Sequence, residues 1–163
     1  MSEVIRKSVV EKFYECDKHE EKIRIAKKYL SSRMPLSLEE YRHLDDVAAS
    51  FIDQLIFRFS KLQDTLGEKI FPAILLLSGE EVKRKTFIDI LNRLEELGVV
   101  NKVRWLQLRE SRNQVAHEYS FNVDQLIDSI NLIFTATDEL ITLYNSVKSF
   151  VSSRFSLLAL DKS

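Results

Sequence analysis

Very little in this chain interrupts a helix. Its 163 residues include only three glycines and two prolines, and the apolar residues recur at spacings of three and four. Such a spacing places apolar side chains on one face of an α-helix, whereas a spacing of two would place them on one face of a β-strand. We therefore predict an all-α fold, a bundle of antiparallel helices.

Stop and cap residues divide the first half of the chain into two long helices. The first is predicted from about Glu3 to Leu30, because Pro35 soon afterwards forbids a regular helix. Ser37 and Glu40 then form a Ser-x-x-Glu capping pattern. From this pattern we predict one long helix that continues to Gly67, the expected C-terminal stop.

Similar signals divide the second half. Pro72 is expected near the start of a short helix, and Thr86 opens a helix that Gly98 closes. A further helix is predicted to start near Asn101, and Asn122 opens the last one. The expected core face of that last helix consists of Leu126, Ile130, Ile133, Phe134, Leu140 and Tyr144.

Length and composition favour one domain over residues 1–163, with the first 30 or so and the last ten residues at its periphery. A hydrophobic content of 45% supports a core of this size. Lys and Arg number 24 and Asp and Glu 25, giving a net charge of -1. Because there is no global basic field, any nucleic-acid site must be local.

Two observations bear on location and cofactors. Cys16 is the only cysteine, which excludes an intramolecular disulfide and zinc sites built from several cysteines, and suits a reducing cytoplasm. The longest apolar run, FPAILLL, is much shorter than the ~20 residues of a membrane span. We expect a soluble cytoplasmic protein with no membrane segment, metal or cofactor.

The octapeptide RNQVAHEY, residues 112–119, gathers the side chains best suited to chemistry. On a helical wheel, one narrow stripe contains Trp105, Leu108, Arg112, Val115 and Tyr119. Arg112 is therefore expected inside an apolar seam, where a guanidinium requires an acceptor. That acceptor could be Glu110, Glu118 or an acid on a neighbouring helix.

The geometry of a single helix separates the two strongest candidates. Asn113 and His117 are four residues apart and share a face, but His117 is ~140° around the helix from Arg112. Two arrangements would bring both to one phosphate. Either the helix ends near Ala116 and His117 turns back, or two copies of the helix meet across a two-fold axis. Taken singly, each residue could also be structural.

The motif Arg112-Asn113-x-x-x-His117-x-Tyr119 resembles the Arg-x4-His-x-Tyr signature of HEPN domains, specifically the HepT-like toxins of bacterial toxin–antitoxin pairs. A weaker similarity in pattern extends from about Leu44 to Tyr144. The resemblance implies a short helical bundle and a metal-independent endoribonuclease that cleaves RNA as a homodimer. The two motifs would share one cleft.

The residue types suit that chemistry. His117 can act as a general acid or base near neutral pH, and Arg112 offers several donors to phosphate oxygens. Asn113 would orient the phosphate or the imidazole. Arg58 and Asp64, on an earlier helix, could line the cleft, although both could equally be solvated surface charges. Arg109 could add local positive charge to the cleft.

The resemblance also implies a partner. Tyr119 matches the position where an MntA-like nucleotidyltransferase antitoxin attaches AMP in HepT-like toxins, although a buried core tyrosine is a competing interpretation. Two other functions stay open. The chain could be a non-catalytic nucleotide- or partner-binding subunit that accompanies a nucleotidyltransferase, or a purely structural helical dimer, which would leave Arg112 unexplained.

Overall fold

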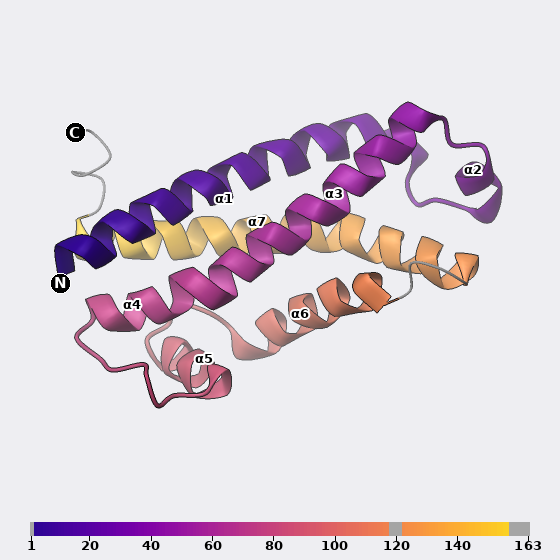
Figure 1. Cartoon of the computed structure of the whole chain (residues 1–163). Helices are drawn as coiled ribbons and strands as arrows, with labels where there is room; N and C mark the ends of the chain where they lie inside the picture. The colour runs from indigo at the N-terminus through magenta and orange to yellow at the C-terminus, as the bar shows by residue number, and fades with distance from the viewer. Residues whose placement is uncertain (1, 118–121, 157–163) are drawn as a thin grey trace.

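The computed structural model describes residues 2–117 and 122–156 of the chain (Figure 1). Helices make up 84% of the structure, and no strand occurs in the described residues, which confirms the all-α prediction. None of the helices in these ranges combines the length and apolar character needed to cross a lipid bilayer.

The elements follow one another in a simple order. They are α1 (Ser2–Leu30), the 3-10 turn η1 (Ser31–Arg33), α2 (Leu38–Arg42), α3 (Asp46–Thr65), the π-helical turn η2 (Leu66–Ile70), α4 (Phe71–Leu77), α5 (Phe87–Glu96), α6 (Lys102–His117) and α7 (Val123–Phe155). In Figure 1, α3 and α7 run antiparallel to α1, and α6 runs antiparallel to α7. The helix α3 contacts both α6 and α7.

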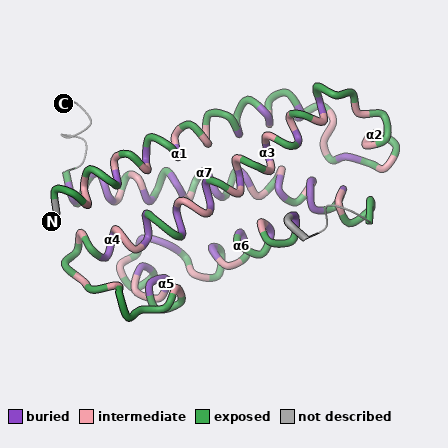
Figure 2. Tube along the Cα trace, in the orientation of Figure 1, coloured by how far each residue is buried: buried purple, intermediate pink, exposed green. Residues whose placement is uncertain are grey.

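A single hydrophobic cluster joins the long helices, and Figure 2 shows the buried positions along their inner sides. The helix α1 contributes Val9, Phe13, Cys16, Ile23, Ala26 and Leu30 to this cluster. The hydroxyl of Tyr144 on α7 also donates a hydrogen bond to Asp17 Oδ1 on α1, at 2.7 Å. The prediction that the first 30 residues are peripheral is therefore wrong, because α1 packs along α3 as part of the core.

The local cap signals were predicted correctly. Thr86 and Asp89 form a reciprocal capping box, with hydrogen bonds of 3.1 and 3.0 Å. Gly98 follows α5 with a φ of +76°, the left-handed conformation that ends many helices. The side chain of Asn122 accepts a hydrogen bond from the Gln125 amide at 3.1 Å and so opens α7.

The single helix predicted from Ser37 to Gly67 is wrong at its start. Ser37 accepts a hydrogen bond from the Glu40 amide at 3.1 Å, but the helix it opens is the short α2. A second cap follows eight residues later, where Asp45 accepts from the Ala48 amide at 2.7 Å and opens α3. Two competing caps thus divide what the apolar pattern presents as one helix.

The predicted stop at Gly67 is also wrong. The chain continues through η2 into α4, with Pro72 in the first turn of α4, where the missing N–H is tolerated. Gly67 instead lies against Trp105, because an added Cβ would stand only 2.9 Å from Trp105 Cζ2. This glycine allows a close approach between helices and does not end one.

Cys16 is fully buried. Burial, and then the negative charges of Asp17 and Glu15, raise the pKa of its thiol to about 12. The thiol is therefore protonated and inaccessible at neutral pH, and acts as a small apolar core residue.

Candidate functional site

The motif lies at the C-terminal end of α6. This helix is opened by Asn101, whose side-chain oxygen accepts a hydrogen bond from the Arg104 amide at 3.0 Å. Its buried face is formed by Trp105, Leu108, Ser111 and Val115. Arg112 lies beside this face with its side chain 30% exposed, so it is partly buried along the predicted seam and not enclosed within it.

Arg112 forms an ion pair with Asp64 of α3, the neighbouring helix. Arg112 Nε donates to Asp64 Oδ1 at 3.2 Å, and Arg112 Nη2 donates to Oδ2 at 3.0 Å. An acid on a neighbouring helix was one of the acceptors predicted for Arg112. Two parallel charge-assisted hydrogen bonds fix the plane of the guanidinium as well as its position.

This pairing uses only part of the guanidinium. A guanidinium has five N–H donors, and the contact with Asp64 uses one on Nε and one on Nη2. No other acceptor for Arg112 is recorded in the described residues. Among the described residues, the Nη1 group and the second Nη2 hydrogen have no recorded acceptor, and together they form a donor edge suited to an anion with two oxygens.

The remaining motif residues are only partly described. Asn113 is exposed beside Arg112. The backbone of α6 continues through Ala116 and ends at His117, close to the end that one of the two predicted arrangements required, so both arrangements stay predictions. The His117 side chain and the whole of Tyr119 lie outside the described part of the structure.

Arg58 is not brought to the Arg112–Asp64 pair. It lies six residues before Asp64, ~120° around α3, and faces α1. There its Nη1 is 3.0 Å from Nδ1 of His19, and its Nε is buried with no partner in the described residues. The contact with α1 therefore holds Arg58 on a different face of α3 from Asp64, and its place in the cleft stays a prediction.

His19 was missed by sequence analysis. Burial lowers its pKa, and the positive charge of Arg58 lowers it further, so the imidazole is held neutral and its Nδ1 can accept from Arg58. Nothing in its sequence neighbourhood marks this histidine. Its environment is created by the packing of α1 on α3.

Arg109 and Asp64 line one cavity of about 240 Å³ next to the ion pair, together with Gln63, Gly67, Glu68, Phe87 and Trp105. The Arg109 guanidinium lies 4.8 Å from the centre of the Phe87 ring. The structure therefore brings Arg109 close to Asp64 and Arg112, on the side of α6 that faces η2.

A buried glutamine joins the two helices beneath this cavity. Assigned from the groups that surround it, the Gln63 amide nitrogen donates to the Leu108 carbonyl at 3.1 Å and its oxygen accepts from the Arg109 amide at 2.8 Å, which joins Gln63 to the backbone of α6. A polar residue within the apolar stripe of α3 was the available sequence signal for this contact. No group of three or more His, Cys, Asp or Glu residues suited to a metal ion occurs among the described residues.

Comparison of the chain with protein-family models, with curated proteins and with solved structures found no match. The resemblance to HEPN domains therefore rests on residues 112–119 and on the order of the helices around them. Chemically, the described site offers a fixed arginine that uses two of its five donors on Asp64, near a helix end at which a histidine stands.

Proposed function

We propose that this protein is a cytoplasmic, metal-independent endoribonuclease and the toxin of a toxin–antitoxin pair. Arg112, Asn113 and His117 would act on RNA at a cleft shared by two copies of the chain. The observation that carries the proposal is the Arg112–Asp64 pair, in which Nε and Nη2 of Arg112 donate to the two carboxylate oxygens. This contact fixes the guanidinium and points its Nη1 edge elsewhere, where it could bind a phosphate.

The proposed reaction is an internal transesterification. The 2′-hydroxyl of a ribose loses its proton to a neutral imidazole and attacks the adjacent phosphorus, forming a P–O2′ bond. The P–O5′ bond breaks, and a protonated imidazole donates a proton to the leaving 5′-oxygen. Arg112 stabilises the charge on the non-bridging oxygens in the transition state. The products are a 2′,3′-cyclic phosphate and a 5′-hydroxyl.

In this proposal, a second copy of the chain brings a histidine close to Arg112. Because α6 continues to His117, Arg112 and His117 of one helix lie ~140° apart. A two-fold axis beside α6 would place His117 of one copy near Arg112 of the other, so that the shared cleft would contain two equivalent arginine–histidine pairs.

The antitoxin belongs to the same proposal. A cognate MntA-like nucleotidyltransferase would transfer AMP from ATP to Tyr119, with the tyrosine oxygen attacking the α-phosphorus and pyrophosphate leaving. The added phosphodiester and nucleoside would repel and exclude RNA. Mass spectrometry after co-expression should then show an AMP adduct that Tyr119→Phe lacks.

The alternative is a non-catalytic subunit that binds a nucleotide or a partner beside a nucleotidyltransferase. The Arg112–Asp64 ion pair supports this alternative in part. Because Asp64 already balances the charge of Arg112, the arginine has less charge to offer a transition state than an unpaired one would have. The ion pair could then hold a ligand phosphate without any turnover.

RNA cleavage in EDTA separates the two functions. Wild-type protein should cleave single-stranded RNA, and Arg112→Ala or His117→Ala should lower the rate by on the order of 10²-fold or more. Arg104→Ala is the matched control, because this arginine is on the same helix and its side chain is 69% exposed. It should cleave as wild type does, and circular dichroism checks that every variant folds.

Intact RNA with the wild-type protein, together with nucleotide binding that Arg112→Ala weakens, would favour the binding subunit and overturn the ribonuclease proposal.

A further inference from the structure

The cavity beside the ion pair has walls of two different kinds. Phe87 provides most of the aromatic surface, because Trp105 also lines the cavity but is almost fully buried, while Asp64, Glu68 and Arg109 provide charged groups. Gly67 also lines the cavity and packs against the Trp105 ring, which an added Cβ at this position would meet. The capping box of α5 places Phe87 at the first residue of that helix.

The charges argue against a phosphate in this cavity. Asp64 and Glu68 line it, and because the charge of Asp64 is already paired with Arg112, the repulsion of an anion would come mainly from Glu68. Arg109, whose guanidinium lies against the Phe87 ring, is the only cation among the lining residues, all of which are described. Mixed charges around aromatic walls suit a flat, uncharged ligand that carries both donors and acceptors.

A guanine base meets these requirements best. Its N1–H and N2–H groups lie on one edge, where a carboxylate can accept from both, and its O6 and N7 accept from an arginine. Glu68 is exposed, and no ion pair is recorded for its carboxylate in the described residues, so it is available for that edge. Aromatic rings add stacking energy for any base.

Asp64 connects the cavity to the phosphate site. One carboxylate both lines the cavity and pairs with Arg112, so a base in the cavity and a phosphate on the free edge of Arg112 would be close neighbours. We propose that this cavity is a guanine subsite that selects where RNA is cut. The role in cleavage rests on the proposed ribonuclease function, whereas binding of the base does not.

Guanosine monophosphate is the first probe, and Trp105 is the reporter. Trp105 is the only tryptophan of the chain and lines the cavity, so its fluorescence should change saturably when a base enters. We expect AMP, CMP and UMP to bind about tenfold or more weakly than GMP. Ribose 5-phosphate should have no effect, which separates base binding from phosphate binding.

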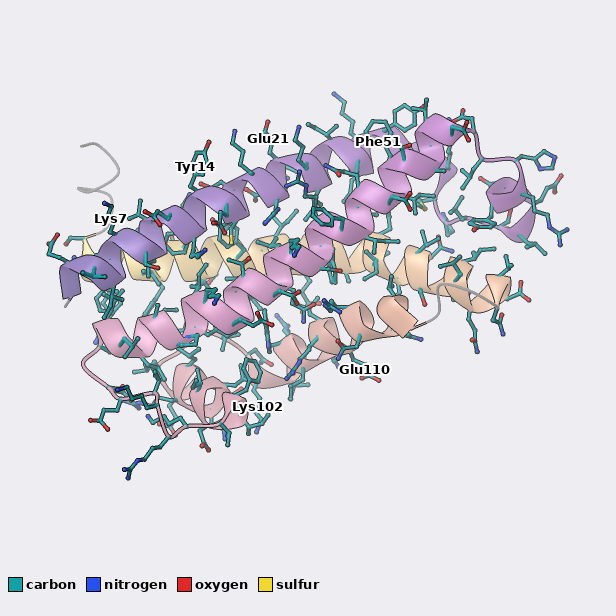
Figure 3. All side chains as sticks on the ribbon, in the orientation of Figure 1. Lys7, Tyr14, Glu21, Phe51, Lys102 and Glu110 are labelled. Carbon is teal, nitrogen blue, oxygen red and sulfur yellow. The ribbon has the colours of Figure 1, made fainter. Side chains whose placement is uncertain are left out.

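Two variants locate the ligand. Glu68→Gln should weaken GMP binding by about tenfold, because the amide keeps one acceptor and places a donor against the base. Phe87→Leu keeps apolar volume but loses stacking, and should also weaken binding. Glu110→Gln is the matched control, since Glu110 lies exposed on the outer side of α6 (Figure 3), and it should bind GMP as wild type does.

Cleavage-site mapping completes the test. Wild-type protein should cut next to guanines, and Glu68→Gln should lose this preference. If GMP binds and Glu68→Gln weakens it while RNA stays intact, the subsite stands and the ribonuclease proposal fails. If RNA is cut without base preference and GMP gives no saturable change, or if all four nucleotides bind equally, the subsite is overturned while the ribonuclease proposal stands.

Discussion

Arg112 and Asp64 are more than a surface ion pair. Exposed pairs contribute little to stability, because solvent screens them and long side chains lose freedom. Here the two hydrogen bonds run side by side, so the carboxylate determines which edge of the guanidinium faces outward. In the proposed mechanism, Asp64 is therefore a positioning residue that acts through Arg112.

Asp64→Asn tests this role. The amide keeps one acceptor but turns donors toward the guanidinium, so we expect Arg112 to lose its fixed orientation and kcat to fall on the order of 10-fold to 100-fold. KM should change less than kcat, and Asp64→Glu should restore part of the rate. In an Arg112→Ala background the same substitution should add almost nothing, because the two residues act as a unit. Simple additivity of the two losses would contradict the positioning role.

His19 makes stability depend on pH. The pKa of His19 in the folded protein lies below the ordinary value of about 6.5 that it has in the unfolded chain. At a pH between the folded and the unfolded pKa, the unfolded chain therefore binds the proton more readily. The contribution of the neutral imidazole is therefore complete above pH ~6.5 and is lost as the pH falls below it. The charged groups that act on His19 are Arg58 and Lys61, which lower its pKa, and Glu15, which raises it.

We expect the urea midpoint of the wild-type protein to fall between about pH 7 and about pH 5 more steeply than that of His19→Gln. The glutamine carbonyl can still accept from Arg58 but does not titrate. The difference between the two proteins isolates His19 from the other two histidines. Identical pH profiles would show that the imidazole is not held neutral by Arg58 and burial.

Among the elements, the continuous run from α3 through η2 to α4 depends on a glycine in an unexpected role. Gly67 lies inside a helical run, where glycine costs about 1 kcal/mol relative to alanine. The close approach of Trp105 outweighs this cost, because a Cβ at 2.9 Å would have to displace a fully buried indole ring.

Gly67→Ala should therefore destabilise the protein by roughly 1–3 kcal/mol, despite the better helix propensity of alanine. Urea unfolding followed by circular dichroism measures the change. The near-ultraviolet signal of Trp105 should also change, because its ring must move. A more stable variant with an unchanged tryptophan signal would mean that η2 and α6 do not approach so closely.

The accuracy of sequence prediction varied with the range of the interactions. The caps at Thr86 and Asn122 were predictable because each depends on a side chain and a backbone amide three residues away. The break before α3 was missed because Ser37 and Asp45 are two valid caps and the apolar pattern does not choose between them. Gly67 was misread as a helix stop, and Gln63 was missed. In both cases the partner lies on α6, distant in sequence. For Arg112, the need for an acid was predictable, but not the identity of Asp64.

At the scale of the whole molecule, the proposed site is incomplete in one chain. Arg112 is held in place by α3, and α6 ends at His117, five residues further along the chain. The proposed homodimer would give two equivalent sites, each with an arginine from one copy and a histidine from the other. Light scattering should give twice the mass of the chain.

Mixing two inactive variants tests the shared site. In a heterodimer of Arg112→Ala and His117→Ala, one of the two sites would have both wild-type residues and the other neither. Random exchange of subunits should then restore about a quarter of the wild-type activity. No recovery in a mixture that has demonstrably exchanged subunits would mean that both residues act within one chain.

The ends of the cleaved RNA test the central claim most directly. A 5′-labelled single-stranded RNA is incubated with wild-type protein in EDTA, and the new 3′ ends are identified by mass spectrometry. Attack by the 2′-hydroxyl, aided by imidazole and arginine alone, predicts 2′,3′-cyclic phosphates with matching 5′-hydroxyls, and none with Arg112→Ala. Products with 3′-hydroxyl ends, or RNA that is cut only when a divalent cation is supplied, would contradict the account.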